Sequence, residues 1–395
     1  MNTSFRNSIA AMLPDLIEWR QDFHRHPELM YDLPRTAGLV AERLRSFGFD
    51  EVIEGIGKTG ILGILHGSSG PAASKDKRVL FRADMDALPI EEASGAAYSS
   101  AVAGRMHACG HDGHTAILLG AARYLADTRT FDGTLIFCFQ PAEEGQAGAQ
   151  AMIDDGMLER FPVKGAYALH NWPGMPVGEF GVMRGPAMAS ADGVFITVQG
   201  EGGHAAQPHT TRDPIVAAGH IISAVQTIVS RVVDPFEQAV VSITAINGGD
   251  AFNVIPDKVE MKCGFRCFSE KVAATIEEEL WRICEKTGEA LGVKVTVSRP
   301  PLTPYPPTIN HTTETEIALD AMRAVAGADK VRDDLKPVMG SEDFAFILRQ
   351  VPGAYVLLGN GCSAALHNPG YDFADDAIGY GVAYWSELAA RVLPK

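Results

Sequence analysis

Residues 115–139 read TAILLGAARYLADTRTFDGTLIFCF, and their pattern changes halfway along. Residues 115–125 repeat apolar side chains with a period near 3.6, which is typical of a helix packed against a core. Residues 134–139 are a short apolar run bounded by turn residues, which is typical of a buried strand. A similar run, VLFR, lies at residues 79–82. Strands that alternate with helices predict an α/β domain whose largely parallel sheet is flanked by helices on both faces.

After Gly185 the pattern is that of a smaller, two-layer domain. We expect strands at residues 193–199, 239–246, 259–266 and 293–298, and helices at residues 213–231 and 270–291. This β-α-β-β-α-β order is the split-βαβ, ferredoxin-like layout of an α+β domain. We therefore expect residues 187–299 to form an inserted domain, and residues 1–186 and 300–395 to form the larger one.

Composition excludes several classes of protein. The 395 residues include 34 Lys and Arg against 49 Asp and Glu, and the net charge of −15 argues against a nucleic-acid partner. No stretch approaches the roughly 20 apolar residues of a membrane span, so no membrane association is expected. Six irregularly spaced cysteines do not suggest a disulfide framework, and the N-terminal segment reads as an amphipathic helix rather than a signal sequence. We expect a multi-domain protein of the cytoplasm.

Three short stretches concentrate side chains of the types that bind metals. The first is MHACGHDGHT at residues 106–115, which contains His107, Cys109, His111, Asp112 and His114. A single such residue is more often structural, but five of them separated by small residues favour a metal site. A cysteine and a histidine that are two positions apart can approach one cation from the same side of an extended loop.

The second stretch is QPAEEG at residues 140–145, directly after an expected strand. Two adjacent glutamates cannot point the same way, so one can bind a metal while the other moves a proton in front of it. Alone, this pair would be read as a solvated acidic turn, but active-site loops of α/β domains follow strands. The third signal is His170 in ALHNW, with His367 in a similar LHNP setting near the C-terminus.

One cysteine, one glutamate and three histidines are too many ligands for one tetrahedral zinc with an open position. They fit two divalent ions that share ligands, and both Cys109 and Glu144 are able to bridge the ions. We expect two ions per chain, with manganese, zinc, nickel and cobalt all compatible with this donor set. The sequence has neither a phosphate-binding GxxxxGK[ST] run nor a Gly-x-Ser-x-Gly nucleophile elbow.

At these residues the chain resembles the dinuclear-metal amidohydrolases related to aminoacylase and glutamate carboxypeptidase. It is most similar to their branch of hippurate hydrolases, N-acyl-amino-acid amidohydrolases and plant-type auxin-conjugate hydrolases. Further matching motifs are RADMDALP (82–89), GGHAAQPH (202–209), FNVIPD (252–257) and GSEDF (340–344), so the resemblance covers nearly the whole chain. It implies hydrolysis of the amide bond of a hippurate-like or N-acetylated amino acid, which releases a carboxylic acid and a free amino acid.

The resemblance also implies roles for individual residues. The family's metal ligands match Cys109, His111, Glu144, His170 and His367. Glu143 matches the general base, and His204 matches a residue that reaches the substrate carbonyl, in many relatives from the neighbouring subunit of a dimer. Asn253 and Arg266 match positions that hold the substrate carboxylate. The histidines not expected to bind metal are His24, His26, His107, His114 and His209.

One position departs from related branches, which have a histidine ligand where this chain has Arg82. Asp84 is therefore expected to be a supporting residue rather than a ligand. The inserted domain is expected to act as a lid and to form a homodimer through an edge strand at residues 239–246. Two alternatives stay open, namely a dipeptidase or carboxypeptidase of the same fold and a non-catalytic binding protein on this scaffold. Intact Glu143 and His204, with all five ligands, argue against the second alternative.

Overall fold

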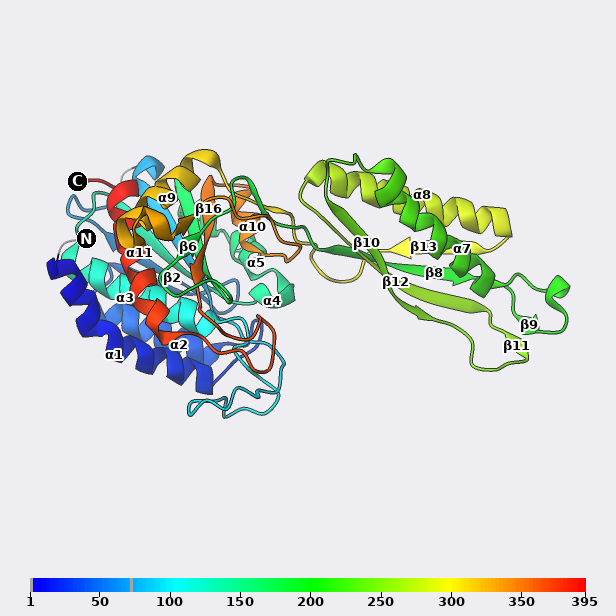
Figure 1. Ribbon diagram of the computed structural model, residues 1–395, viewed down its shortest axis with the longest axis horizontal. Helices are drawn as coiled ribbons and strands as arrows, with labels where there is room; N and C mark the ends of the chain where they lie inside the picture. Colours follow the sequence, from blue (N-terminus) through cyan, green and yellow to red (C-terminus); the bar gives the residue numbers. More distant parts are fainter. Residues whose placement is uncertain (1–2, 72–73) are drawn as a thin grey trace. The chain divides into compact units, whose positions relative to one another are not determined.

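The computed structural model describes residues 3–71 and 74–395. The chain divides into two compact units (Figure 1). The first unit comprises Met1–Ala187, Ile309–Lys336 and Asp343–Lys395, and the second comprises Met188–Thr308 and Pro337–Glu342. The chain thus returns to the first unit later than the expected residue 300. The reason is local, because Tyr305 and Ala191 of the second unit exchange two backbone hydrogen bonds of 2.9 and 3.0 Å.

The first unit contains an eight-stranded sheet in the order β1-β2-β4-β3-β5-β16-β6-β15. Its strands are β1 (Glu51–Ile56), β2 (Gly60–His66), β3 (Arg78–Asp84), β4 (Thr134–Gln140), β5 (Gly165–Trp172), β6 (Phe180–Gly181), β15 (Val331–Arg332) and β16 (Gly353–Gly359). The four central strands β4, β3, β5 and β16 are parallel. Strands β1 and β2 add an antiparallel edge, and β6 is antiparallel to β16. The expected mostly parallel sheet is confirmed.

Helices flank this sheet (Figure 1). The longer ones are α1 (Thr3–Arg25), α2 (Pro34–Ser46), α3 (His111–Thr128), α9 (Thr312–Ala326) and α11 (Ile378–Val392). The shorter ones are α4 (Glu143–Gln146), α5 (Gly148–Asp154), α6 (Met157–Arg160) and α10 (Phe344–Leu348). Phe81 of β3 packs against the rings of Phe137 of β4 and Trp385 of α11. This core holds the ends of β3, β4 and β5, from which the site loops leave.

The second unit is a four-stranded antiparallel sheet in the order β10-β12-β8-β13, with two helices. Its elements in chain order are β8 (Asp192–Gln199), α7 (Pro214–Thr227), β10 (Ala239–Asn247), β12 (Lys258–Cys267), α8 (Glu270–Leu291) and β13 (Lys294–Ser298). The expected β-α-β-β-α-β order is confirmed. A separate two-stranded ribbon consists of β9 (Gly203–His204) and β11 (Val254–Ile255). The chain passes between the units at β7 (Pro186–Met188) and β14 (Thr308–Ile309), and again before and after Pro337–Glu342.

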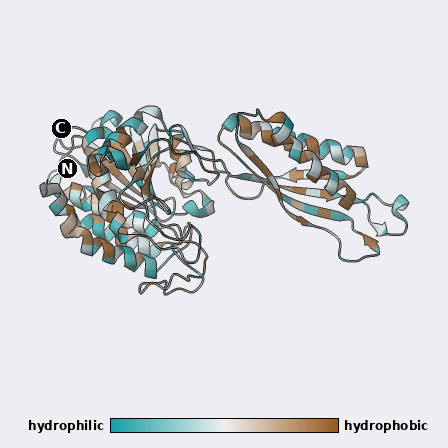
Figure 2. Ribbon diagram, in the orientation of Figure 1, coloured by the Kyte–Doolittle hydropathy of each residue, from teal (hydrophilic) through white to brown (hydrophobic). Residues whose placement is uncertain are grey.

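One helix of the second unit differs from expectation. Helix α7 continues into a π-helical turn, η3 (Ile228–Val232), and together Pro214–Val232 are long and apolar enough to cross a membrane by length and composition alone. The expectation that no segment approaches a membrane span was therefore wrong as to length and apolar composition. Only 28% of the apolar window is buried in the unit. Ile221 is buried, whereas Ile215 and Val229 are exposed, and much of α7 is coloured as hydrophobic in Figure 2.

Candidate metal centre

The five side chains expected to bind metal meet in the first unit, at and beyond the carboxyl ends of β4 and β5. Three overlapping groups have ligand atoms within 4.8 Å of one another, namely Cys109, His111 and His170; Cys109, Glu144 and His367; and His111, Glu143 and Glu144. Because these groups share Cys109, His111 and Glu144, they form one continuous cluster, which we call the metal cluster. Glu143, the expected base, therefore lies among the expected ligands.

Gly110 sets the spacing between Cys109 and His111. Its φ is +86°, and a Cβ atom there would lie 2.4 Å from both the side-chain amide nitrogen of Asn171 and the hydroxyl of Tyr371. Only glycine combines this backbone conformation with so close an approach. The turn leaves Cys109 in the loop, with its Sγ 3.4 Å from Nε2 of His170, and makes His111 the first residue of α3.

Hydrogen bonds orient the two buried histidines of the metal cluster. Nδ1 of His170 donates to the carbonyl of Asn171 at 2.6 Å, and Nδ1 of His111 donates to the carbonyl of Asp86 at 2.8 Å. A carbonyl oxygen only accepts, so in the neutral ring each Nε2 carries the lone pair that a metal requires. Among the described residues, Nε2 of His111 is buried and has no hydrogen-bond partner. Oε1 of Glu144 is also buried without a hydrogen bond, and its neighbour at 3.2 Å is Nε2 of His367, another expected ligand. Both atoms are therefore placed to ligate a cation.

The charge around His111 also favours a cation. Burial by itself would lower the pKa of His111, but the carboxylates of Asp84 and Asp86 outweigh burial and raise the pKa to about 10. Burial would raise the pKa of Asp84, yet His111 and Arg82 hold that pKa well below its usual range. A site that stabilises a proton on this buried imidazole also stabilises a divalent ion bound at Nε2 in place of that proton.

Strained backbone accompanies two parts of the metal cluster. His367 has a φ of +64°, its N–H donates to the carbonyl of Ala108 at 2.8 Å, and its Nε2 lies 3.2 Å from Oε1 of Glu144. Ala142, directly before Glu143, has a φ of +54°. Such conformations cost about 1–3 kcal/mol each in non-glycine residues and concentrate at functional sites. The strain is therefore consistent with a functional role for both loops.

His114 lies beside the metal cluster without a nitrogen to offer it. Nε2 of His114 accepts the backbone N–H of Asn171 at 2.9 Å, so Nδ1 carries the proton and donates to Asp84 at 2.6 Å. Both ring nitrogens are thus engaged, although Asp84, His111 and His114 form a further group of ligand-type atoms. Asp84 is also paired with Arg82 at 2.6 Å, which favours a supporting role for this carboxylate.

The other histidines expected not to bind metal lie outside these groups. His24 sits between Glu92 and Asp112, His26 contacts the backbone of Asp22, His107 is buried, and His209 is exposed. Sequence reasoning did not single out Asn171 or Tyr371. The amide of Asn171 donates to the carbonyl of Cys109 at 2.6 Å, and the hydroxyl of Tyr371 donates to the Asn171 side chain at 2.8 Å. The one available signal was that Asn171 directly follows His170.

Three expected substrate-contacting residues belong to the second unit. His204 on β9 pairs with Val254 on β11, and the N–H of Ala205 donates to the carbonyl of Asn253 at 3.0 Å. His204 and Asn253 are therefore neighbours at the same two-stranded ribbon. Arg266 lies near the opposite end of β12 from that ribbon, where its Nη1 donates to the carbonyl of Met339 at 2.8 Å.

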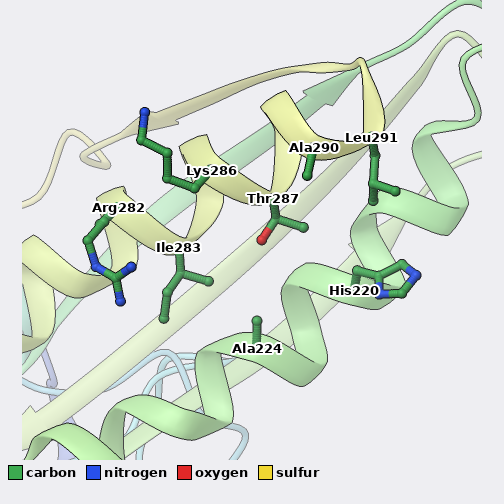
Figure 3. A pocket seen from close by; sticks show the side chains of 8 residues that line it. All are labelled: His220, Ala224, Arg282, Ile283, Lys286, Thr287, Ala290 and Leu291. Atoms are coloured by element: carbon green, nitrogen blue, oxygen red, sulfur yellow. The ribbon is translucent and has the colours of Figure 1, made fainter.

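A shallow pocket between α7 and α8 is a weaker candidate for chemistry (Figure 3). It is lined by His220, Ala224, Arg282, Ile283, Lys286, Thr287, Ala290 and Leu291. These eight residues include no carboxylate and no cysteine, and Arg282 and Lys286 are paired with Glu279 and Glu289. We therefore place the candidate active site at the metal cluster.

Comparison with known proteins shows the family of the chain. The model of peptidase family M20/M25/M40 matches residues 80–391. The chain is 39% identical to hippurate hydrolase of Campylobacter jejuni, with 97% of this chain and 99% of that protein covered. It is 37% identical to N-acetylcysteine deacetylase of Bacillus subtilis, with coverage of 96% and 97%.

A solved structure is similar over the same length. It is a dinuclear metal-binding peptidase of the M20 family from Bacillus subtilis, with a TM-score of 0.83, 33% identity, and coverage of 97% of this chain and 99% of that one. The similarity thus extends through both units. The chain belongs to peptidase family M20/M25/M40, in the amidohydrolase branch that contains hippurate hydrolase, N-acetylcysteine deacetylase and IAA-amino acid hydrolases.

Proposed function

We propose that this M20 amidohydrolase cleaves the amide bond of N-acyl amino acids, either hippurate-like or N-acetylated, and releases a carboxylic acid and a free amino acid. The observation that carries the proposal is the metal cluster, in which five ligand-type side chains come together and two of them, His111 and Glu144, lie beside Glu143. The names of the relatives support this substrate class, because both hippurate and N-acetylcysteine are N-acyl amino acids.

Two divalent cations would be held by Cys109, His111, Glu144, His170 and His367. Manganese, zinc, nickel and cobalt all suit a mixed set of thiolate, imidazole and carboxylate donors. When bound, the cations would supply Lewis-acid polarisation of the amide carbonyl and would acidify water. Cys109 must stay reduced to act as a ligand, and all six cysteines are free, so we propose a cytoplasmic location.

Glu143 is the proposed general base and acid. It is 7% exposed, and its carboxylate lies within 4.8 Å of ligand atoms of His111 and Glu144. It takes a proton from water as the water oxygen bonds to the amide carbon, and it returns that proton to the amine as the carbon–nitrogen bond breaks. His204 stabilises the carbonyl oxygen as negative charge develops there. Asn253 and Arg266 are the proposed contacts of the substrate carboxylate, and because they lie near opposite ends of β12, a two-fold mate would supply one of them.

The substrate class is tested with purified protein supplied with manganese, zinc, cobalt or nickel. Release of the free amino acid is measured from N-benzoyl, N-acetyl and indole-acetyl amino acids, and from dipeptides that have a free amine. We expect hydrolysis of one or more N-acyl amino acids and little hydrolysis of the dipeptides. A preference for dipeptides would favour a dipeptidase, and a metal-loaded chain that cleaves none of these amides would favour a binding protein.

We also propose a homodimer that forms through the second unit. Strand β10 lies at the edge of the four-stranded sheet, so one side of its backbone is free to pair with a two-fold mate. The large apolar side chains exposed in this unit include Ile215, Val216, Val229, Val232, Phe236, Val240 and Ile246. They lie on α7, on η3 and on or just before β10. Burial of these side chains against a second copy of the chain would explain why apolar residues of α7 are exposed, and no membrane is then needed to cover them.

Charge placed on β10 is expected to dissociate the dimer. In the double variant Val240→Lys and Ile246→Lys, both substituted side chains are already exposed, so the fold tolerates them while pairing of two charged edges does not. Light scattering should change from twice the chain mass of 42.3 kDa to that mass. Leu302→Lys, at an exposed apolar site away from β10, is the matched control. A wild-type chain that is fully active as a monomer would show that His204 acts within its own chain or not at all.

A further inference from the structure

Asp86 contacts three residues of the metal cluster at once. It follows β3, is 1% exposed, and is not itself one of the expected ligands. Its Oδ1 accepts the backbone N–H of Glu143 at 3.0 Å, and its Oδ2 accepts that of Glu144 at 3.1 Å. Its carbonyl accepts Nδ1 of His111 at 2.8 Å. One buried residue thus binds the backbone of both glutamates and the imidazole of His111.

The loop that carries the two glutamates depends on contacts from outside itself. Ala142 has a φ of +54°, and α4 is interrupted by non-helical angles at Glu144 and Gly145. Farther along, a Cβ atom on Gly148 would lie 1.6 Å from the carbonyl of Pro141, so the turn is also tightly closed. The N–H groups at the start of a helix have no partner within the helix. Here Asp86 supplies partners for two of them from 57 and 58 residues away in sequence.

We propose that Asp86 is a positioning residue for the metal cluster. Fixing two consecutive peptide N–H groups fixes the plane of the peptide between them. The side chains of Glu143 and Glu144 then leave in different directions, one as base and one as ligand. The carbonyl of the same residue fixes the tautomer of His111, so that Nε2 faces the cluster. This inference rests on the proposed function for the roles of the two glutamates.

Two substitutions separate the contributions of the two carboxylate oxygens. Asp86→Asn keeps the shape but has one acceptor oxygen, so its amide group must face one of the two peptide N–H groups, donor against donor. Asp86→Ala removes both acceptors. Partners that orient metal ligands typically contribute about 10–100-fold in metal affinity or activity. We expect a loss of about that size in metal affinity and in kcat, larger for Ala than for Asn, with KM changed much less.

Metal affinity is measured by titrating the metal-free protein with cobalt(II) or zinc(II) by calorimetry, which needs no substrate. The matched control is Asp375→Asn. Asp375 is also a paired carboxylate of the first unit, but it binds Arg20 and Gln21 of α1 rather than the metal cluster. We expect Asp375→Asn to lower the melting temperature and to leave metal affinity and kcat unchanged.

A purely structural role for Asp86 would give the same pattern as the control. If Asp86→Asn lost stability but bound two ions with wild-type affinity and retained kcat, the proposal would be overturned. If Asp86→Ala failed to fold, the near-isosteric Asn variant would decide the outcome. Failure of the proposed function looks different, because wild-type protein would then hydrolyse no N-acyl amino acid while the metal titrations of the Asp86 variants could still be compared.

Discussion

The Glu143→Gln variant is expected to keep both metal ions and the substrate affinity of the wild type, whereas its kcat should decrease by orders of magnitude. Gln preserves the shape of the side chain and its hydrogen bonding but lacks a basic oxygen. General acid–base groups are typically worth about 10²–10⁴ in rate. The loss here is expected at the upper end or beyond, because one residue serves both the attack of water and the departure of the amine. Metal analysis and steady-state kinetics on purified protein measure the effect.

The neighbouring glutamate provides the matched control. Glu144 is the proposed ligand, and its Oε1 lies 3.2 Å from Nε2 of His367, so Glu144→Gln should lower metal occupancy and activity together. If Glu143→Gln lost metal instead, the two glutamates would have the opposite roles. A kcat close to that of the wild type would remove Glu143 from the mechanism and leave it as a turn residue.

Removal of metal is expected to abolish activity completely, and addition of one or more divalent ions should restore it. Without cations at the metal cluster, no group would polarise the amide carbonyl or acidify water. About two ions per chain should bind at saturation, as measured by elemental analysis after dialysis. Restoration by several different metals would be consistent with the mixed donor set.

Cys109→Ser offers a specific check of the metal prediction. The hydroxyl nearly preserves the size of the side chain but replaces a soft thiolate by a weaker ligand, so affinity for zinc should fall more than affinity for manganese. Thermal unfolding of the metal-free variant controls for loss of structure at this buried position. Full activity in thoroughly metal-free wild-type protein would refute metal-assisted hydrolysis.

Local sequence patterns were sufficient for much of the fold. The apolar period of residues 115–125 predicted the central part of α3, and the run at residues 134–139 predicted β4. The β-α-β-β-α-β order of the second unit could also be predicted, because β8 and β12 alternate between buried and exposed residues. Such patterns are local consequences of helix and strand geometry, so they need no knowledge of distant contacts.

Sheet order and strand direction could not be predicted as fully from local sequence patterns. The antiparallel edge formed by β1 and β2, and the two-residue strand β6 beside β16, depend on which segments the tertiary fold brings together. The exposure of α7 was missed for a similar reason. Its composition is that of a buried helix, and only the packed unit shows that Ile215 and Val216 face away from the core.

The motifs around Cys109, Glu143 and His170 identified the side-chain types needed for a two-metal site, because metal ligands are recognisable by residue type and spacing. Only the tertiary structure determined how those side chains are held. Asp86 is hydrogen-bonded to Glu143, which lies 57 residues later in the sequence, and Tyr371 is hydrogen-bonded to Asn171, 200 residues earlier. His367 contacts Glu144 from a loop in which His367 itself has a positive φ. Hydrogen bonds between distant segments produce no periodic pattern in the sequence, because each depends on how the strands and loops that carry its donor and acceptor pack together.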